Sequence, residues 1–377
     1  MKVLQVYRTY YPDSQGGLEE AIRQIARGTS ALGADNRIFS LQRKPGDAVI
    51  DYPEATVYRS HRHLSIKSCD IGFKAAPLFK ELYRWCDVVH YHFPWPFADL
   101  LEAAVGGNKP YIITYHSDIV RQKKLGLIYS PLMNNFLKGA ARIIATSDNY
   151  CQSSSILANY AKTVAVIPLG IDQASYPDAS TSLLETTRQE YGSDFYFFVG
   201  VFRYYKGLHI LLNAIKDAAY QVVIAGAGHE EEALKEQAKV LGLNNVHFPG
   251  FVSDEKKVAL LTLSKAVVFP SHLRSEAFGI TLLEAAMMGK PMISTEVGTG
   301  TSFVNLNETT GLVVAPNNPS LLRRAMDRLY NNPEETKKMG QMARQRYLEK
   351  FTGKVVGGSY YQLYQTIINE NSHSKPT

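Results

Sequence analysis

The feature that most constrains the fold is a repeated alternation of short, β-rich apolar runs with polar loops and segments of helical spacing. In the first half, helical spacing is clear over Glu19–Leu32. The predicted strands there are Val3–Tyr7, Asn36–Leu41, Thr56–Arg59, Val88–His92, Tyr111–Tyr115, Ile143–Thr146 and Val164–Ile167. Alternation of this kind is typical of parallel strands joined by helices. We therefore predict an α/β fold with a parallel sheet covered by helices on both faces.

The alternation begins again after a polar stretch over 172–193, and we place the link between two domains near Pro168–Pro177. The second set of predicted strands is Phe195–Val199, Gln221–Ala225, Val246–Pro249, Ala266–Phe269, Met292–Ser294 and Gly311–Val314. The predicted helices are Leu208–Lys216, Glu230–Leu241, Asp254–Leu263, Gly279–Met288, Pro319–Asn331, Pro333–Phe351 and Gly357–Glu370. We predict domains over 1–172 and 173–352, and a segment 353–377 that holds a last helix and a disordered tail from Ser372. A length of 377 residues suits two domains.

Composition excludes several classes of protein. No apolar run approaches the ~18 residues of a membrane span. The three cysteines, Cys69, Cys86 and Cys151, are far apart and predict free thiols in a reducing cytoplasm. The net charge of +6 is modest, and no zinc-finger spacing or RNA-binding aromatic string predicts a nucleic-acid partner.

The most informative motif is Phe-Pro-Ser-His-Leu-Arg-Ser-Glu-Ala-Phe-Gly-Ile-Thr-Leu-Leu-Glu over 269–284. It predicts a strand, a loop with Glu276, and a helix that Gly279 opens and that carries Glu284. Free N–H groups at such a helix start can hold a phosphate or sugar oxygen. The two carboxylates are placed to grip opposite ends of one elongated ligand, although most carboxylates simply face water.

This motif resembles the E-x7-E motif of the retaining, nucleotide-sugar-dependent glycosyltransferases of family 4. Further motifs of that family follow in order over nearly the whole chain: Gly16-Gly17, Thr114-Tyr-His-Ser-Asp118 and Arg203-Tyr-Tyr-Lys206-Gly207. The resemblance implies the GT-B arrangement, in which two Rossmann-like, doubly wound domains face a cleft and the terminal helix crosses back to the first domain. It also implies sugar transfer without a change of anomeric configuration.

Arg203 and Lys206 are the predicted counter-charge for the donor diphosphate. A basic pair beside a helix start is unfavourable against the helix dipole, which favours a functional role. The resemblance implies that this pair contacts the diphosphate. Gly16 and Gly17 have no Cβ and let the backbone approach a ligand; in the family this loop lies against the donor phosphate and the acceptor.

The resemblance also assigns the rest of the donor site. It implies that Glu276 holds the donor sugar and Glu284 the ribose hydroxyls, with the intervening donor-binding residues Ala277, Phe278, Gly279 and Ile280. Asp254 is either a guanine-binding carboxylate or a helix N-cap. Many family members carry Glu where this chain has Ser302, which puts one usual donor contact in doubt.

His116 follows a predicted strand and stands where parallel sheets bind ligands. The resemblance implies that it lines the reaction centre, and that Asp118 helps to position the acceptor. We predict no metal and no cofactor, because the sequence holds no Asp-x-Asp and because His90 and His92 lack a nearby carboxylate cluster.

Longer strings, such as Tyr91–Phe97 and Thr114–Gln122, resemble bacterial mannosyltransferases that build O-antigen. They imply transfer of α-D-mannose from GDP-mannose to a lipid-linked oligosaccharide. The alternatives are GDP-D-rhamnose or another nucleotide sugar as donor, a sugar-nucleotide 2-epimerase, and a non-catalytic nucleotide-sugar binder.

The basic cluster Arg121, Lys123 and Lys124 stands beside apolar residues. It predicts acceptor binding and contact with an anionic membrane surface, unless it is merely a solvated helix face. We therefore expect a cytoplasmic protein, peripheral at the inner face of the cytoplasmic membrane. The linkage formed, the acceptor and the oligomeric state stay open.

Overall fold

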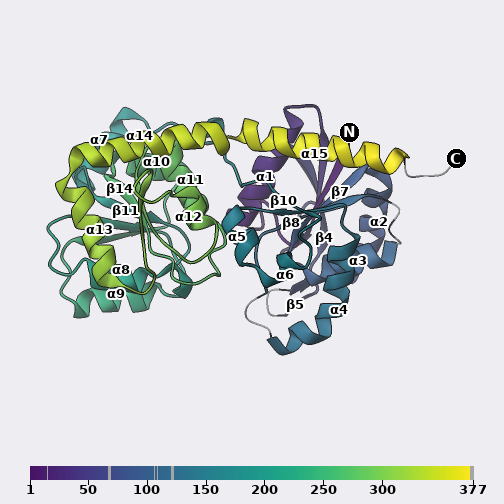
Figure 1. The fold of residues 1–377 in the computed structure, drawn as a ribbon, viewed down its shortest axis with the longest axis horizontal. Coiled ribbons are helices and arrows are strands. Elements are labelled where there is room, and N and C mark those ends of the chain that lie inside the picture. Colours follow the sequence, from purple (N-terminus) through teal and green to yellow (C-terminus); the bar gives the residue numbers. More distant parts are fainter. Residues whose placement is uncertain (15, 67–68, 106, 108, 120–122, 374–377) are drawn as a thin grey trace. The chain divides into compact units, whose positions relative to one another are not determined.

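The computed structural model describes residues 1–14, 16–66, 69–105, 107, 109–119 and 123–373, and only the backbone of 123–128. The chain forms two compact units (Figure 1). Unit 1 is Met1–Gly170 with Gly353–Thr377, and unit 2 is Ile171–Thr352. The predicted divisions, after residues 172 and 352, lie within two residues of these limits.

Unit 1 is built on an eight-stranded sheet in the order β10-β9-β8-β7-β1-β2-β4-β3. All neighbours are parallel except β3 and β4, an antiparallel edge hairpin whose first strand was not predicted. The strands are β1 Lys2–Val6, β2 Asp35–Gln42, β3 Val49–Tyr52, β4 Ala55–His61, β7 Val88–Phe93, β8 Tyr111–Tyr115, β9 Arg142–Ala145 and β10 Val164–Val166. A separate two-stranded sheet consists of β5 Leu64–Ile66 and β6 Cys69–Ile71.

The helices of unit 1 are α1 Gly17–Ser30, α2 Ala75–Trp85, α3 Pro96–Val105, α4 Lys123–Gly139, α5 Asp148–Ser153, α6 Ser155–Ala158 and α15 Gly353–His373. Helix α15 returns to unit 1 and packs on α1 (Figure 1), as predicted. A Cβ on Gly357 would lie 2.5 Å from the Cα of Gly28, so the two helices cross in close contact. Tyr360 and Tyr364 of α15 join the unit 1 core. Ser372 lies in this helix, so a disordered tail starting there was wrong.

Unit 2 contains a six-stranded, wholly parallel sheet in the order β13-β12-β11-β14-β15-β16. Its strands are β11 Tyr196–Val199, β12 Val222–Ala225, β13 Val246–Gly250, β14 Ala266–Phe269, β15 Met292–Thr295 and β16 Gly311–Val314. From β11 in the middle, the first three strands are added in order toward one edge of the sheet, and β14, β15 and β16 are added toward the other edge. This is the Rossmann order, and its direction reverses between β11 and β14, where such sheets bind ligands.

The helices of unit 2 are α7 Thr181–Tyr191, α8 Leu208–Ala214, α9 Glu231–Val240, α10 Asp254–Leu263, α11 Ile280–Met287, α12 Gly300–Val304, α13 Pro319–Asn331 and α14 Pro333–Lys350, with short 3-10 turns η1 Gln173–Ser175 and η2 Tyr204–Lys206. Helix α7 lies in the stretch that was predicted to be a polar link. Ser180 caps it by accepting a hydrogen bond from the Leu183 N–H, and Tyr191 is buried.

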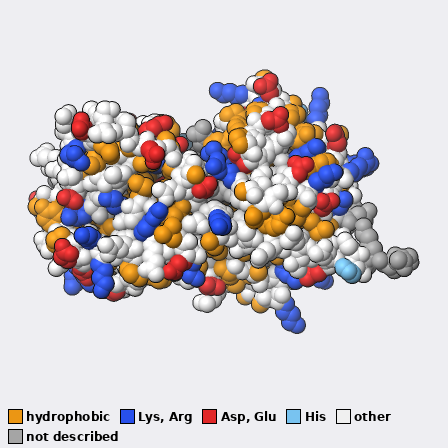
Figure 2. Space-filling view, turned by 90° about the horizontal axis from the view of Figure 1, so that it is seen from above, with side chains coloured by type: hydrophobic (Ala, Val, Ile, Leu, Met, Phe, Trp, Pro, Cys, Tyr) orange, Lys and Arg blue, Asp and Glu red, His pale blue; other side chains and the backbone are white. Residues whose placement is uncertain are grey.

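The surface supplies two further observations. Across the described ranges, no helix is both long and apolar enough to cross a membrane. Figure 2 shows one face of the molecule, where Lys and Arg side chains alternate with Asp and Glu side chains instead of forming one basic field. The three cysteines are free thiols, as predicted.

Candidate active site

The turn η2 and the loop after β14 meet where the strand order of unit 2 reverses. Gly207 ends η2 in the left-handed region, with φ of 70°, and a Cβ there would lie 2.1 Å from the Pro270 carbonyl oxygen. Only glycine allows this approach without a backbone shift. The close contact sets the basic turn after β11 against the segment that carries Glu276.

Lys206 and Glu276 form an ion pair at this junction. The Nζ of Lys206 donates to Oε2 of Glu276, and the Ser271 hydroxyl donates to the same oxygen at 3.2 Å. The side chains of Lys206 and Glu276 are 12% and 9% exposed. Nζ also lies 4.5 Å from the centroid of the Phe269 ring. Both residues were predicted as donor contacts, but their direct pairing was not.

Arg203 is the N-cap residue of η2 and is exposed. Its guanidinium makes no hydrogen bond or ion pair with any residue that the structure describes. A permanently charged, planar donor without a protein partner is suited to bind an anionic group such as a phosphate.

The segment from Ala277 to Ile280 offers backbone groups, and not polar side chains, to a ligand. Phe278 is buried, and the Ala277 carbonyl oxygen accepts a hydrogen bond from the Gly300 N–H at 2.8 Å. Gly279, with φ of 93°, is the N-cap of α11, which begins at Ile280. The first N–H groups of a helix have no partner within that helix. The contribution that this segment can make to a ligand is therefore a set of N–H donors.

Glu284 lies on α11 in a cluster that sequence analysis missed. Its Oε1 accepts from the Tyr176 hydroxyl at 3.0 Å and lies 2.9 Å from Nζ of Lys257. Lys257 Nζ is also 2.9 Å from Oδ1 of Asp254. Burial alone would lower the pKa of Lys257, but the two carboxylates hold that pKa above its usual range. Lys257 is therefore a charged bridge between Asp254 and Glu284.

The N-cap alternative for Asp254 is wrong. Ser253 is the N-cap of α10, because its hydroxyl accepts a hydrogen bond from the Lys256 N–H at 3.3 Å. Asp254 is the first residue of the helix, and its side chain is 67% exposed. Its carboxylate is therefore accessible to a ligand.

In unit 1, Gly16 is the N-cap of α1 and has an extended backbone. A Cβ there would lie 2.8 Å from Oε2 of Glu19, whose Oε1 accepts from the Thr9 hydroxyl at 2.7 Å. Glycine at position 16 thus leaves room for a carboxylate that sequence analysis did not single out. Gly17 is the first residue of the helix.

His116 follows β8 at the carboxyl end of the unit 1 sheet, where its N–H extends the strand pairing to the Phe93 carbonyl oxygen. Burial lowers its pKa to about 3, so the imidazole is neutral near pH 7. Its Nε2 lies 3.0 Å from Nδ1 of His92. The ring nitrogens of His90 both contact hydroxyl groups, those of Tyr364 and Thr114. Within the described ranges, no three His, Cys, Asp or Glu side chains are grouped to hold a metal.

Comparison with known proteins shows the family of this chain. Residues 15–175 match the family model described as Glycosyltransferase Family 4, and residues 185–346 match that described as Glycosyl transferases group 1. D-rhamnosyltransferase WbpZ of Pseudomonas aeruginosa is 48% identical over 93% of this chain and 92% of its own. The chain belongs to the family 4 glycosyltransferases.

A second relative and a solved structure extend this result. O-antigen chain mannosyltransferase C of Escherichia coli is 41% identical over 99% of this chain and 100% of its own. Among solved structures, sucrose-phosphate synthase of Thermosynechococcus elongatus superposes with a TM-score of 0.81 at 20% identity, over 98% of this chain and 99% of that one. The two Rossmann-like units of this glycosyltransferase thus form the GT-B fold.

Asp118 of the glycosyltransferase fixes the loop after β8. Its Oδ1 accepts hydrogen bonds from the hydroxyls of Tyr115 at 2.9 Å and Ser154 at 2.7 Å, and its N–H donates to the Tyr150 hydroxyl at 2.6 Å. Of the other residues predicted to bind the acceptor, Arg121 lies outside the described residues, as do the side chains of Lys123 and Lys124.

A carboxylate stands beside Ser302, where many family members have Glu. The Ser302 hydroxyl donates to Oε1 of Glu296 at 3.0 Å, and the Gly298 N–H donates to the same oxygen at 2.8 Å. Glu296 follows β15 directly and was not predicted as a site residue. Its position depends on the turn after β15, which the spacing of the motif does not reveal.

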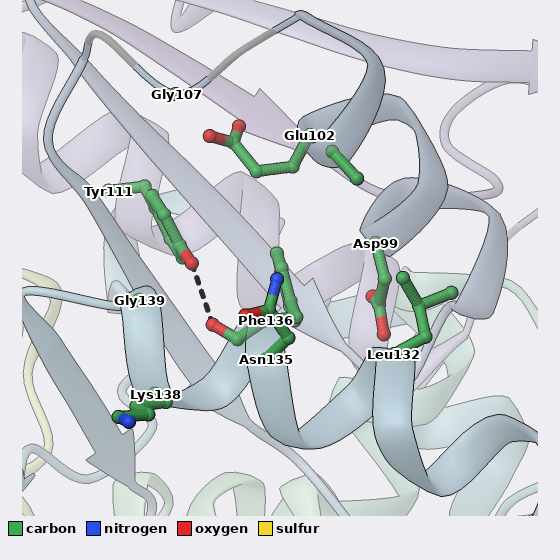
Figure 3. Close-up of a pocket in the computed structure, with 10 residues that line it drawn as sticks. Asp99, Glu102, Gly107, Tyr111, Leu132, Asn135, Phe136, Lys138 and Gly139 are labelled. Atoms are coloured by element: carbon green, nitrogen blue, oxygen red, sulfur yellow. Dashed lines mark hydrogen bonds between the residues drawn. The ribbon is translucent and has the colours of Figure 1, made fainter.

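A separate pocket of about 500 Å³ lies in unit 1 among α3, β8 and α4 (Figure 3). Burial raises the pKa of Asp99 to about 7 and also raises the pKa of Glu102. Asp99 already accepts from the Tyr129 hydroxyl, and Glu102 from the hydroxyls of Tyr83 and Tyr91. Tyrosine hydroxyls thus engage both carboxylates, and among the described residues none that was predicted to bind the donor lines this pocket.

Proposed function

We propose that this glycosyltransferase transfers D-mannose from GDP-mannose to a lipid-linked oligosaccharide of O-antigen, with retention of anomeric configuration. The observation that carries the proposal is the Lys206–Glu276 pair where the unit 2 sheet reverses its strand order. In this proposal, Lys206 is the cation that neutralises the diphosphate and Glu276 is the carboxylate that binds the sugar. The 41% identical mannosyltransferase supports mannose as the sugar.

A second candidate is D-rhamnose, carried as GDP-D-rhamnose. The relative that is 48% identical is a D-rhamnosyltransferase, which favours it. D-rhamnose is 6-deoxy-D-mannose, so both candidates share the configuration of the ring hydroxyls. The two donors place the same demands on Lys206 and Glu276 and differ in one hydroxyl group.

The proposed roles follow from the charges. The transition state separates a positive sugar from a negative diphosphate, so electrostatic stabilisation of the leaving group supplies most of the catalysis. Arg203, Lys206 and the N–H groups at the start of α11 neutralise the departing phosphates. Glu276, which Lys206 and Ser271 hold in place, accepts hydrogen bonds from sugar hydroxyls. Glu284 accepts from the two ribose hydroxyls.

A donor panel tests the proposal. The purified protein is heated with GDP-mannose, GDP-D-rhamnose, UDP-glucose or no ligand, and is then assayed with and without a lipid-linked acceptor. We expect GDP-mannose to stabilise the fold and an α-linked mannose to appear only with acceptor. Stabilisation by UDP-glucose alone would exclude a GDP donor. A sugar altered without acceptor would indicate an epimerase, and no reaction at all would indicate a binder.

We propose that the Asp254 carboxylate binds the guanine base of the donor. We expect Asp254→Ala to reduce the preference for GDP over UDP by roughly 10-fold, the scale of a lost hydrogen bond to a charged group. Its thermal midpoint should stay near that of the wild type, because the side chain is exposed and caps no helix. Titration calorimetry with both nucleotides measures the preference. Glu255→Ala, which removes the neighbouring acid on α10, is the control, and an equal change there would exclude the role.

We expect activity to be independent of divalent metal. Arg203, Lys206 and the α11 N-terminus supply positive charge to the diphosphate, and the sequence contains no Asp-x-Asp. Turnover should therefore be the same in EDTA as in Mg²⁺ or Mn²⁺. Loss of turnover in EDTA with recovery on addition of Mn²⁺ would contradict this.

The membrane proposal rests on the sequence of the basic cluster. Attraction to anionic lipid is worth about 1 kcal/mol per basic residue near the surface and is screened by salt. We expect reversal of Arg121, Lys123 and Lys124 to Glu to weaken binding to anionic vesicles and to slow turnover of a lipid acceptor. A water-soluble acceptor analogue should react as before. Unchanged vesicle binding and lipid turnover would remove this role.

A further inference from the structure

A line of buried side chains connects α1 to His116. At its far end, the Nδ2 of Asn36 donates to the Ala26 carbonyl oxygen at 3.3 Å and to the Thr29 hydroxyl oxygen at 3.1 Å. The Thr29 hydroxyl in turn donates to the Ile25 carbonyl oxygen at 2.8 Å. Because a carbonyl oxygen only accepts, the Asn36 amide cannot be reversed without placing two oxygens against each other.

The orientation of the Asn36 amide determines which atom donates in each of the next hydrogen bonds. Oδ1 of Asn36 accepts from Nε2 of Gln5 at 3.3 Å, which turns Oε1 of Gln5 toward Nε2 of His92 at 3.1 Å. His92 must therefore donate from Nε2. Burial, together with neighbouring His90 and His116, holds the pKa of His92 well below its usual value, so the ring carries one proton. Its Nδ1 is then an acceptor, and Nε2 of His116 must be the donor.

We propose that this relay of Asn36, Gln5 and His92 fixes His116 in the tautomer with the proton on Nε2 and leaves its Nδ1 lone pair for a sugar hydroxyl. Gln5 and Asn36 are positioning residues that act through His92. The part of the inference that concerns the sugar rests on the proposed function. The part that concerns the tautomer rests on the hydrogen bonds alone.

The tautomer matters for the chemistry. A neutral imidazole has one donor nitrogen and one acceptor nitrogen. With the proton on Nε2, Nδ1 of His116 carries the lone pair and can accept a hydrogen bond from a hydroxyl. Positive charge develops on the sugar as the diphosphate departs, and a lone pair stabilises that charge, whereas an N–H would oppose it.

Nitrogen NMR tests the tautomer directly. The complete protein is labelled with ¹⁵N-histidine, and two-bond proton–nitrogen spectra are recorded without substrate at pH 8, with His116→Asn used for assignment. We expect an unprotonated Nδ1 and a protonated Nε2 for His116. The opposite pattern in the wild type would overturn the proposal, whether or not the relay variants fold.

Two variants interrupt the relay at different points. In Gln5→Met, His92 loses its acceptor, and in Asn36→Leu the Gln5 amide is free to reverse. We expect the averaged Nδ1 signal of His116 to move toward its protonated position in both variants. Turnover at low donor concentration should fall roughly 2- to 5-fold, in proportion to the fraction of His116 left in the active tautomer. An unchanged His116 signal in a folded Gln5→Met protein would overturn the relay.

Tyr364→Phe is the matched control. Tyr364 is as buried as Gln5, and its hydroxyl contacts the neighbouring His90 instead of the relay. We expect it to leave the His116 signals unchanged, and a shift equal to that of Gln5→Met would overturn the assignment to Gln5. Because the spectra need no donor, a failed donor assay with the expected tautomer would count against the proposed function and not against the relay.

Discussion

Replacing Lys206 by alanine should lower kcat by roughly 10²-fold or more, the scale of one lost preorganised electrostatic contact. The change removes a cation from the departing diphosphate. It also leaves the mostly buried Glu276 carboxylate without its counter-charge, so that the carboxylate repels the phosphates. We therefore expect a lower thermal midpoint as well, by a few degrees. Initial rates at saturating donor and a melting curve measure both effects.

Arg203→Ala separates the two effects. Arg203 is exposed and has no partner among the described side chains, so we expect a comparable loss of turnover with an unchanged melting curve. Lys290→Ala is the control for loss of a lysine, because Lys290 donates to the carbonyl oxygens of Thr262 and Ser264 before the amino ends of β14 and β15. Near-wild-type turnover in either site variant would remove that residue from the proposed site.

Substitutions of the two carboxylates of the motif should have different effects on GDP binding and on transfer. We expect Glu284→Gln to weaken binding of GDP by about 10- to 100-fold, the scale of hydrogen bonds to a charged group. Glu276→Gln should instead lower kcat for transfer by roughly 10²-fold. Its affinity for GDP should be equal to that of the wild type or higher, because the change frees Lys206 from its ion pair.

Titration calorimetry with GDP and initial rates with the sugar donor separate these outcomes. Glu308→Gln serves as the control, since Glu308 binds Arg328 on the exposed surface. Equal loss of GDP affinity in both site variants would contradict the division of roles. A loss confined to Glu276→Gln would reverse it.

Sequence periodicity predicted each strand of the two large sheets except β3, but of the described helices of unit 1 it predicted only α1 and α15. The bounds of Asp254–Leu263 and Pro319–Asn331 agree with α10 and α13, since each helix directly follows a capping residue, Ser253 or Asn318. Helix α7 was missed because few of its side chains are buried and its sequence is mostly polar. Strand β3 was missed because it is a partly exposed edge strand of four residues.

The sequence predicted the residues of the candidate site but not the contacts among them. Motif spacing identified Lys206, Glu276 and Glu284. The roles of Tyr176 and Lys257 around Glu284 depend on which helices pack together, and local spacing carries no such information. His92 was considered only as a metal ligand, because its contact Gln5 lies far away in the sequence, on β1, and reaches the His92 ring only through its side chain.

Because α15 packs on α1 at Gly28 and Gly357, unit 1 cannot be completed during synthesis until the end of the chain has been made. Unit 1 emerges first from the ribosome, but Tyr360 and Tyr364, which complete its core, emerge only after the whole of unit 2. At about 5–20 residues per second, that interval is on the order of tens of seconds. During it, the nascent unit 1 has an apolar surface with no helix to cover it. Chaperone binding to stalled chains should therefore persist until residue 367 has left the exit tunnel, and early release would show that unit 1 closes without α15.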